Sequence, residues 1–398
     1  MWKQFICLFC TGILLSACQP DDEIPLTDSA LIIENGGGID ALPLTTPAPD
    51  GNPTTSARVE LGRVLFWDPI LSGHKDVSCA TCHHPAFGYS DGRDLPLGVG
   101  AVGLGPNRRD QSGGDIPVVG RNSPSVINTA FNGYLGQANY DPALAPMFWD
   151  NRLLSLENQA LGPPLSFNEM RGHAFPADVA LDSIVARIRA IPEYRTMFRE
   201  AFGVGNQVSD ANIGRAIAAF ERTIVAGNSP FDRYMRGETN ALNRREVDGM
   251  NAFVEAGCQT CHGGPMFSDF QPHALGVPEH DALPGADSGV EGSFAFRTPT
   301  LRNLRHTAPY FHNGTSGDLR DVMDHYVRAQ RAARDGDANR LNPNVETLDP
   351  LLGQMDLQRN QVDDIIAFMN ALNDDNFDQS VPSRVPSGLP VGGNIGSF

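Results

Sequence analysis

Two stretches of this chain decide its fold: Cys79-Ala80-Thr81-Cys82-His83 and Cys258-Gln259-Thr260-Cys261-His262. Cys-x-x-Cys-His is the attachment signature of c-type haem. Two thiols one helical turn apart can form thioethers to the two vinyl groups of one porphyrin, and the adjacent histidine then serves as the proximal ligand of the iron. A pair of zinc half-sites is the alternative, but zinc would require more cysteines than the chain can spare. The sequence therefore predicts two covalently bound haem c groups.

The N-terminal segment indicates export. Four of the seven cysteines belong to the haem motifs, and the other three lie within the first 18 residues. An apolar run over residues 5–15 is too short to span a bilayer, so residues 1–17 are expected to be a cleaved signal. Leu15-Ser16-Ala17-Cys18 resembles a bacterial lipobox, and Gln19 favours sorting to the outer membrane. We expect a periplasmic protein that contacts the membrane only through lipid on Cys18; a free Cys18 thiol after ordinary cleavage is the alternative.

The formal net charge of −17 makes nucleic acid an unsuitable partner. An acidic surface would attract a basic electron-carrier protein over a long range. Alternatively, the negative charge only keeps an exported protein soluble, and this explains the charge equally well.

Composition and motif order suggest how the chain is organised. Residues 18–55 are rich in Pro, Thr, Asp and Gly and are expected to form a flexible tether, and residues 379–398 a loose tail. Each haem motif follows a segment with helical periodicity, and the residues after each motif resemble one another. We therefore expect two cytochrome c-like haem domains, at residues 56–226 and 227–378.

The predicted fold class is mostly α with long loops. Apolar periodicity and capping residues predict several helices, over residues 57–66, 179–191, 209–224, 244–256, 318–334 and 360–372. Residues 88–118 are Gly-rich without periodicity and are expected to form a long loop.

At this point the motifs resemble a known family, the bacterial dihaem cytochrome c peroxidases, and within it the MauG-like branch. The resemblance spans residues 57–375 and rests on ordered blocks besides the haem motifs: Leu65–Pro69, Arg121–Pro124, Phe148–Arg152, Gln159–Pro163, Thr298–Asn303 and Thr307–His312. It implies an oxidoreductase in which hydrogen peroxide reacts at the first haem while the second haem transfers electrons.

The resemblance assigns peroxide chemistry to three residues near the first haem. Peroxide cleavage needs a group that moves a proton from the inner to the outer oxygen. Glu169 is expected to do this, with Gln159 orienting the peroxide, and Trp149 is expected to relay electrons between the haems. Read alone, Glu169 would be a solvated loop carboxylate, Gln159 a helix surface residue and Trp149 a packed core residue.

His83 should be the proximal ligand of the first iron. Ordinary family members carry a blocking histidine in the loop before the Arg-Asn-Ser-Pro block, but residues 87–121 here contain none. We therefore expect a five-coordinate first haem that needs no reductive activation.

His262 should be the proximal ligand of the second iron. Tyr326 occupies the position of the distal methionine of ordinary members, as in MauG-like proteins. A phenolate favours ferric and ferryl iron, whereas a thioether favours ferrous iron. Met323 and His325 are the nearby competitors, although His325 should point to the side of its helix.

The resemblance also implies one calcium ion between the domains, at Asn122, Thr307 and Pro309. The expected reaction is reduction of hydrogen peroxide to water with electrons from a small cytochrome c or cupredoxin. The alternatives are a MauG-like enzyme that uses a bis-ferryl state to oxidise side chains of a partner protein, and a dihaem electron carrier without catalysis.

Overall fold

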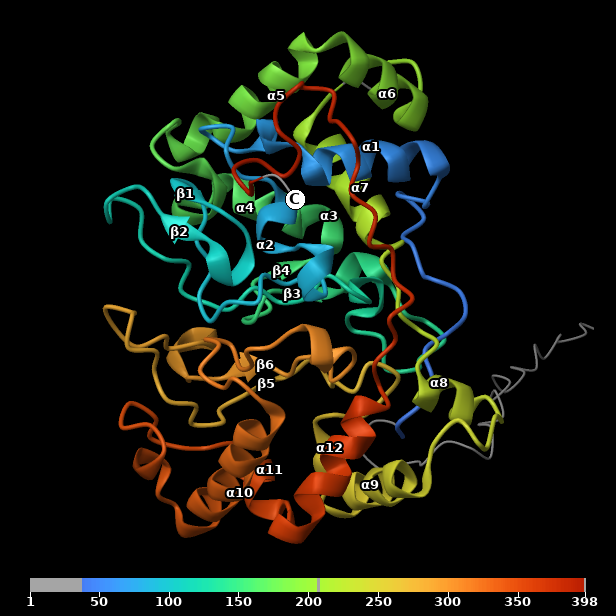
Figure 1. Cartoon of the computed structure of the whole chain (residues 1–398), viewed down its shortest axis with the longest axis vertical. Helices are drawn as coiled ribbons and strands as arrows, with labels where there is room; N and C mark the ends of the chain where they lie inside the picture. Colours follow the sequence, from blue (N-terminus) through green and yellow to red (C-terminus); the bar gives the residue numbers. More distant parts are fainter. Residues whose placement is uncertain (1–37, 206–207, 397–398) are drawn as a thin grey trace, which may run out of the picture.

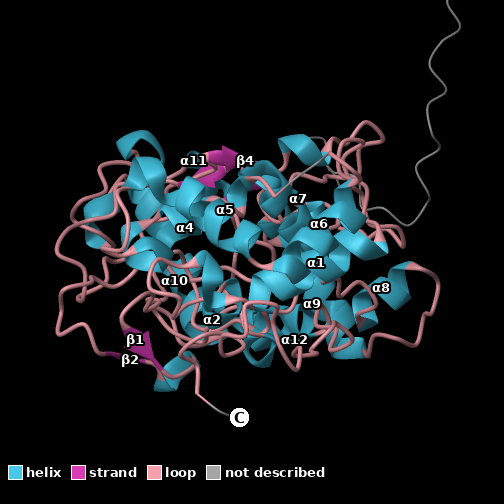
Figure 2. Ribbon diagram, turned by 90° about the horizontal axis from the view of Figure 1, so that it is seen from above, coloured by secondary structure: helices cyan, strands magenta, loops and turns pink. Residues whose placement is uncertain are grey.

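The structure, a computed structural model, describes residues 38–205 and 208–396 (Figure 1). The expected signal at residues 1–17 and the lipidation site Cys18 lie outside the described residues. Helices and loops make up nearly all of the described chain, and the strands are short (Figure 2). The predicted mostly α class is confirmed.

The N-terminal half contains seven of the described α-helices, some of a single turn: α1 (Ser56–Trp67), α2 (Cys79–Cys82), α3 (Leu156–Gln159), α4 (Gly162–Leu165), α5 (Ala180–Ala190), α6 (Pro192–Phe202) and α7 (Asp210–Glu221). The C-terminal half contains α8 (Pro230–Met235), α9 (Arg244–Glu255), α10 (Leu319–Asp335), α11 (Pro350–Gln354) and α12 (Val362–Asn370). The strands form antiparallel pairs: β1 (Ala101–Val102) with β2 (Arg109–Asp110), β3 (Pro146–Met147) with β4 (Leu153–Leu154), and β5 (Pro272–His273) with β6 (Phe296–Arg297).

The same helix pair recurs before and after each haem motif. Helix α1 packs on α7 in the first half, and α9 packs on α12 in the second. A glycine permits each close approach: a Cβ atom on Gly62 would lie 1.9 Å from the carbonyl oxygen of Ala216, and one on Gly249 would lie 1.8 Å from that of Asp364. Since neither distance is sterically possible, both contacts require glycine. The two halves are thus structural repeats at the level of their main helix pairs.

Two separate apolar cores accompany this repeat. One surrounds α1 and α7, and the other surrounds α9 and α12. Figure 1 shows the first group of elements above the second. In the second half, Arg302 donates two hydrogen bonds to the fully buried Asp232, at 2.9 and 3.0 Å. This pairing offsets the cost of removing both charges from water.

The C-terminal segment differs from the expectation. Residues 379–396 return to the first half and pack there, so the prediction of a loose tail is wrong for them (Figure 1). The Gly392 amide donates to the Trp67 carbonyl (2.8 Å), and the Gly392 carbonyl accepts from the Thr81 hydroxyl (2.9 Å). Val385 and Ile395 are buried in the first core. Apolar residues spaced along a Pro- and Gly-rich stretch carry no periodicity, which is why the sequence did not reveal this packing.

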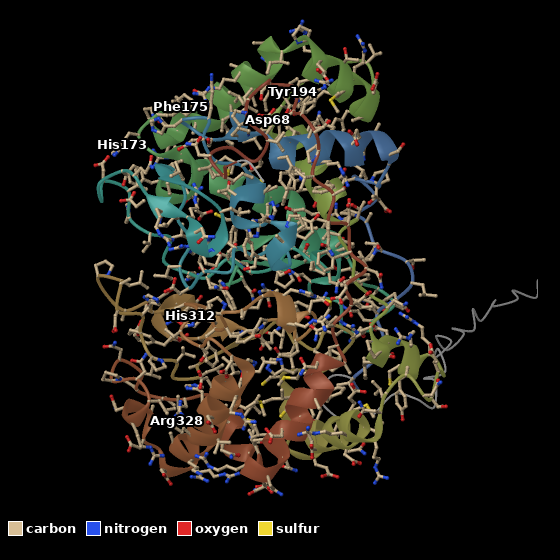
Figure 3. All side chains as sticks on the ribbon, in the orientation of Figure 1. Asp68, His173, Phe175, Tyr194, His312 and Arg328 are labelled. Atoms are coloured by element: carbon tan, nitrogen blue, oxygen red, sulfur yellow. The ribbon has the colours of Figure 1, made fainter. Side chains whose placement is uncertain are left out.

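Asp68 connects this segment to the rest of the first half. Its carboxylate accepts hydrogen bonds from the Tyr194 hydroxyl (2.6 Å) and from the Ser387 hydroxyl (2.7 Å). Figure 3 places Asp68 and Tyr194 together in the upper part of the molecule. The segment is therefore anchored by polar contacts as well as by apolar burial.

The expected tether is also partly ordered. Ile39 and Leu42 are each 1% exposed. The Leu42 amide donates to Asp232 (3.0 Å), and Ile39 forms a bridge to Gly264. The prediction of a flexible tether is therefore wrong for residues 39–42. None of the described helices is long and apolar enough to cross a membrane.

Candidate functional site

Each half contains a cavity built around its Cys-x-x-Cys-His motif. The first, called here the His83 cavity, is lined by Cys79, Cys82 and His83. The second, the His262 cavity, is lined by Cys258, Cys261 and His262. None of these cysteines forms a disulfide. Burial raises the pKa of Cys82 and of Cys258 to about 12, so these thiols are neutral.

Both motif histidines are held in one tautomer. Nδ1 of His83 lies 3.1 Å from the carbonyl oxygen of Tyr89, and Nδ1 of His262 lies 3.0 Å from that of Phe267. A carbonyl oxygen only accepts, so Nδ1 carries the proton in each ring. Burial lowers the pKa of both imidazoles. Each ring therefore offers an unprotonated Nε2, which is the state that binds a metal.

A haem c group therefore fits each cavity on the chemistry of its donors. Each cavity supplies two thiols that form no disulfide and one neutral imidazole oriented through its second nitrogen, and most of the lining surface is apolar. His83 and His262 would bind the irons, and the cysteines would form the thioethers.

Gln159 and Glu169 both line the His83 cavity. Gln159 is the last residue of α3, and Glu169 lies in a π-helical turn, Phe167–Arg171. Such turns are rare and frequent at functional sites. The turn is fixed from both sides, because the Gly73 amide donates to the Met170 carbonyl (2.7 Å) and the Val99 amide donates to the Glu169 carbonyl (3.1 Å). Burial raises the pKa of the Glu169 carboxyl, although Ser166 partly offsets this.

The His83 cavity offers few side chains, apart from His83 itself, of the kinds that bind haem iron. Among the described residues that line the His83 cavity, His83 is the only histidine, and there is no tyrosine or lysine. Two methionines also line it, and Sδ of one, Met147, already accepts a hydrogen bond from Asn132 (3.6 Å).

Trp149 lies in the wall between the cavities and lines both. It is 8% exposed. Its indole N–H donates to the Asn122 carbonyl (2.9 Å), and its own carbonyl accepts from the Arg297 amide (2.7 Å). One contact thus comes from each half: the first half holds the indole, and the second half holds the Trp149 backbone.

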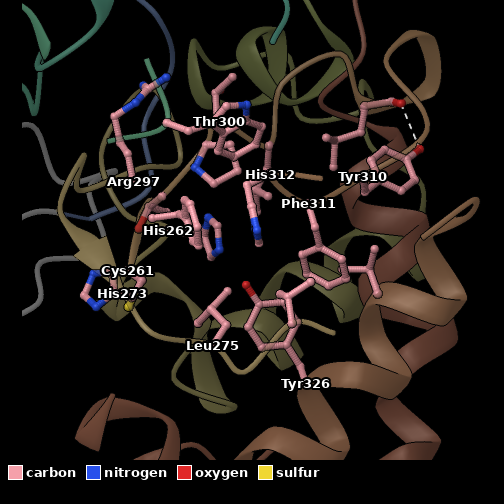
Figure 4. A pocket seen from close by; sticks show the side chains of 18 of the residues that line it. Cys261, His262, His273, Leu275, Arg297, Thr300, Tyr310, Phe311, His312 and Tyr326 are labelled. Atoms are coloured by element: carbon pink, nitrogen blue, oxygen red, sulfur yellow. Dashed lines mark hydrogen bonds between the residues drawn. The ribbon is translucent and has the colours of Figure 1, made fainter. Parts of the chain in front are cut away.

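Tyr326 projects from α10 into the His262 cavity. Figure 4 shows its hydroxyl directed toward His262. Burial holds the pKa of this phenol well above its usual range. Met323 lines the same cavity, whereas His325 donates to the Leu275 carbonyl (3.0 Å) and does not line it. The structure therefore brings Tyr326 and Met323 to the cavity and directs His325 elsewhere.

The expected calcium residues Asn122, Thr307 and Pro309 all line the His262 cavity. The Asn122 side-chain amide donates to the Arg93 carbonyl (2.8 Å), which leaves its side-chain oxygen as an acceptor. An amide oxygen and backbone carbonyls are the kind of donors that Ca²⁺ prefers, so the residues fit the ion.

Charged residues join the halves beside Trp149. Arg121 binds Asp287 through two hydrogen bonds (2.6 and 2.9 Å) and Asp150 through a third contact (2.7 Å). Its guanidinium also lies over the Phe296 ring, which stacks on His312 with centroids 3.6 Å apart.

Comparisons with known proteins agree with this geometry. A family model described as di-haem cytochrome c peroxidase matches residues 56–240. The methylamine utilization protein MauG of Methylorubrum extorquens is 35% identical over 291 residues, which cover 72% of this chain and 73% of that protein. The cytochrome c551 peroxidase of Pseudomonas aeruginosa is 35% identical over 69% of this chain and 72% of that protein.

This chain belongs to the dihaem cytochrome c peroxidase family. Its similarity to MauG places it in the MauG-like branch. The crystal structure of a MauG-like protein associated with microbial copper homeostasis superimposes with a TM-score of 0.65 at 27% identity, covering 84% of this chain and 95% of that one. Membership makes the protein an enzyme of the dihaem oxidoreductase class with covalently bound haem c.

Sequence reasoning missed two residues of this peroxidase. His273 lies between Asp269 (2.9 Å) and Asp349 (2.7 Å); although burial lowers its pKa, these carboxylates raise the value to about 12. Arg297 lines both cavities. Aligning the two repeats would have marked Arg297 as a residue that lines the cavities. Ser123-Pro124 corresponds to Thr298-Pro299, so Arg297 corresponds to Asn122, which also lines both cavities.

Proposed function

We propose that this dihaem peroxidase is exported to the periplasm and reduces hydrogen peroxide to water in the His83 cavity. The observation that carries the proposal is the placement of Glu169 and Gln159 in the cavity of His83, whose described lining contains no second histidine. When bound there, a haem would supply an iron that takes up peroxide and exchanges electrons.

Glu169 moves the proton in this proposal. Its raised pKa brings the carboxyl closer to neutral pH, where one group can both accept and return a proton. The rigid π-helical turn holds the carboxyl in position, so little reorganisation is needed during the reaction. Gln159 offers an amide that can both donate to and accept from a peroxide oxygen.

Trp149 provides the electronic contact between the cavities. Because its indole N–H donates to the Asn122 carbonyl and its backbone carbonyl accepts from the Arg297 amide, its position does not depend on a flexible side chain. Electrons from a small cytochrome c or cupredoxin would enter at the His262 cavity and reach the His83 cavity through Trp149.

Spectra of the oxidised protein and peroxide assays test this proposal. We expect one high-spin and one low-spin ferric haem, and a rapid spectral change with one equivalent of peroxide. The rate at which reduced cytochrome c is then oxidised should saturate as its concentration rises. Two low-spin haems and no response to peroxide would instead establish the electron-carrier alternative.

Tyr326 favours a second candidate function, MauG-like oxidation of a partner protein. A buried phenol directed toward His262 offers a hard oxygen donor that disfavours the ferrous state needed for ordinary turnover. Slow, non-saturating oxidation of reduced cytochrome c, combined with a fast reaction with peroxide, would favour this function over the first.

We further propose that Asn122, Thr307 and Pro309 bind one calcium ion, and that lipid on Cys18 anchors the protein to the outer membrane. The oxygen donors that Asn122, Thr307 and Pro309 offer support the calcium site. Loss of activity with a chelator, restored by Ca²⁺, would test it, and mass analysis of the N-terminal peptide would test the anchor.

A further inference from the structure

Charged side chains from both halves line the His83 cavity. They are the guanidinium groups of Arg121, Arg152 and Arg297 and the carboxyl groups of Asp150, Glu169, Glu221 and Asp287. Arg121 pairs with both carboxylates, and Arg152 pairs with Asp150 (2.8 Å). Among the described residues no carboxylate forms a salt bridge with Arg297. Arg297 therefore has no direct ion-pair partner in the described chain, and Asp150 attracts it only from a distance.

Arg297 is 8% exposed. Its Nε donates to the Phe148 carbonyl (2.8 Å), and its guanidinium lies over the Phe270 ring at 5.9 Å. No hydrogen bond from either terminal nitrogen is formed within the described chain. A buried guanidinium in this state is costly unless an anion meets it.

The direction of the side chain indicates where that anion lies. The Arg297 backbone belongs to the C-terminal half, at the end of β6. Its Nε reaches Phe148, which lines the His83 cavity and not the His262 cavity. Figure 4 shows the guanidinium directed away from Tyr326. Arg297 therefore extends from one half toward the cavity of the other.

We propose that Arg297 binds a propionate carboxylate of the porphyrin attached at Cys79 and Cys82. A carboxylate matches the planar fork of donors that the guanidinium presents. The residue is a positioning residue: it holds the first haem from the opposite half and places a cation beside Trp149. This inference rests on the proposed function only in requiring a haem in the His83 cavity.

Arg297→Gln and Arg297→Lys test the pairing in the holoprotein. A nearby cation favours the ferrous state, so Arg297→Gln should lower the midpoint potential of the His83 haem, and Arg297→Lys should restore most of the shift. The propionate bending band in resonance Raman spectra of that haem should move in both variants, because lysine cannot form the two-pronged contact.

Arg152→Gln is the matched control. Arg152 also lines the His83 cavity, but its side chain is 48% exposed and it already pairs with Asp150. Solvent should screen its charge, so we expect a much smaller shift in potential and no shift of the band.

An unchanged band and potential in Arg297→Gln would overturn the pairing. If that variant fails to bind haem, Arg297→Lys decides: a wild-type band position in the lysine variant would equally overturn it. Peroxide reactivity of the wild-type protein is measured separately, so failure of the proposed function is distinguishable from failure of this inference.

Discussion

Replacing Glu169 by glutamine removes the proposed proton carrier while preserving the size of the side chain. The π-helical turn is held by backbone contacts at Gly73 and Val99, which the substitution does not touch. Glutamine is also neutral, so no unpaired charge is buried. We therefore expect haem content and thermal stability to remain at wild-type values.

The rate of the reaction with peroxide should fall by about 10²-fold or more, the usual contribution of a positioned acid–base group. A 10²-fold loss corresponds to about 2.7 kcal/mol of transition-state stabilisation. In the wild type, the carboxylate must first accept a proton. Because the pKa of Glu169 is raised, the rate should increase with pH through a midpoint above the ordinary value for glutamate, and then level off.

Stopped-flow mixing of the oxidised protein with peroxide over a range of pH measures both effects. Glu169→Gln should be slow and should lose the rise with pH. Glu200→Gln removes a carboxylate from the exposed face of α6 in the same half and serves as the control. A wild-type rate in Glu169→Gln, or an unchanged pH profile, would remove Glu169 from the mechanism.

Three other substitutions test separate parts of the structure. Tyr326→Met should raise the midpoint potential of the His262 haem, because a thioether favours ferrous iron. Met323→Leu should leave that potential unchanged, and potentiometric titration measures it in both variants. Gly249→Ala should destabilise the protein by about 1–3 kcal/mol, because the new Cβ would overlap the Asp364 carbonyl. Alanine usually stabilises a helix relative to glycine, so Asn251→Ala on the exposed face of α9 serves as the control in thermal unfolding. Ile395→Ala should lower the free energy of unfolding by about 2 kcal/mol or more, whereas Val381→Ala, at a side chain that is 46% exposed, should lower it little. Equal losses of stability in the two variants would contradict the packing of the C-terminal segment.

The haem motifs and the main helices were predictable because their signals are local. Cys79 to His83 lie within one helical turn, and the capping contact between Asn243 and Glu246 at the start of α9 also lies within one turn. The resemblance predicted Trp149 between the haems, whereas its contact with Arg297 could not be predicted, because the two residues meet only through tertiary structure. The same holds for residues 39–42 and 379–396, whose few apolar side chains are buried by partners far away in the sequence.

The returning C-terminal segment makes the first half depend on the end of the chain. Val385 and Ile395 complete an apolar core whose other members precede residue 227, apart from Phe377. During synthesis, the amino-terminal repeat emerges from the ribosome long before these side chains exist. A fragment ending at residue 226 would therefore expose the surface around Trp67, and dissection of the protein into single-haem pieces should keep residues 377–396 with the first of them.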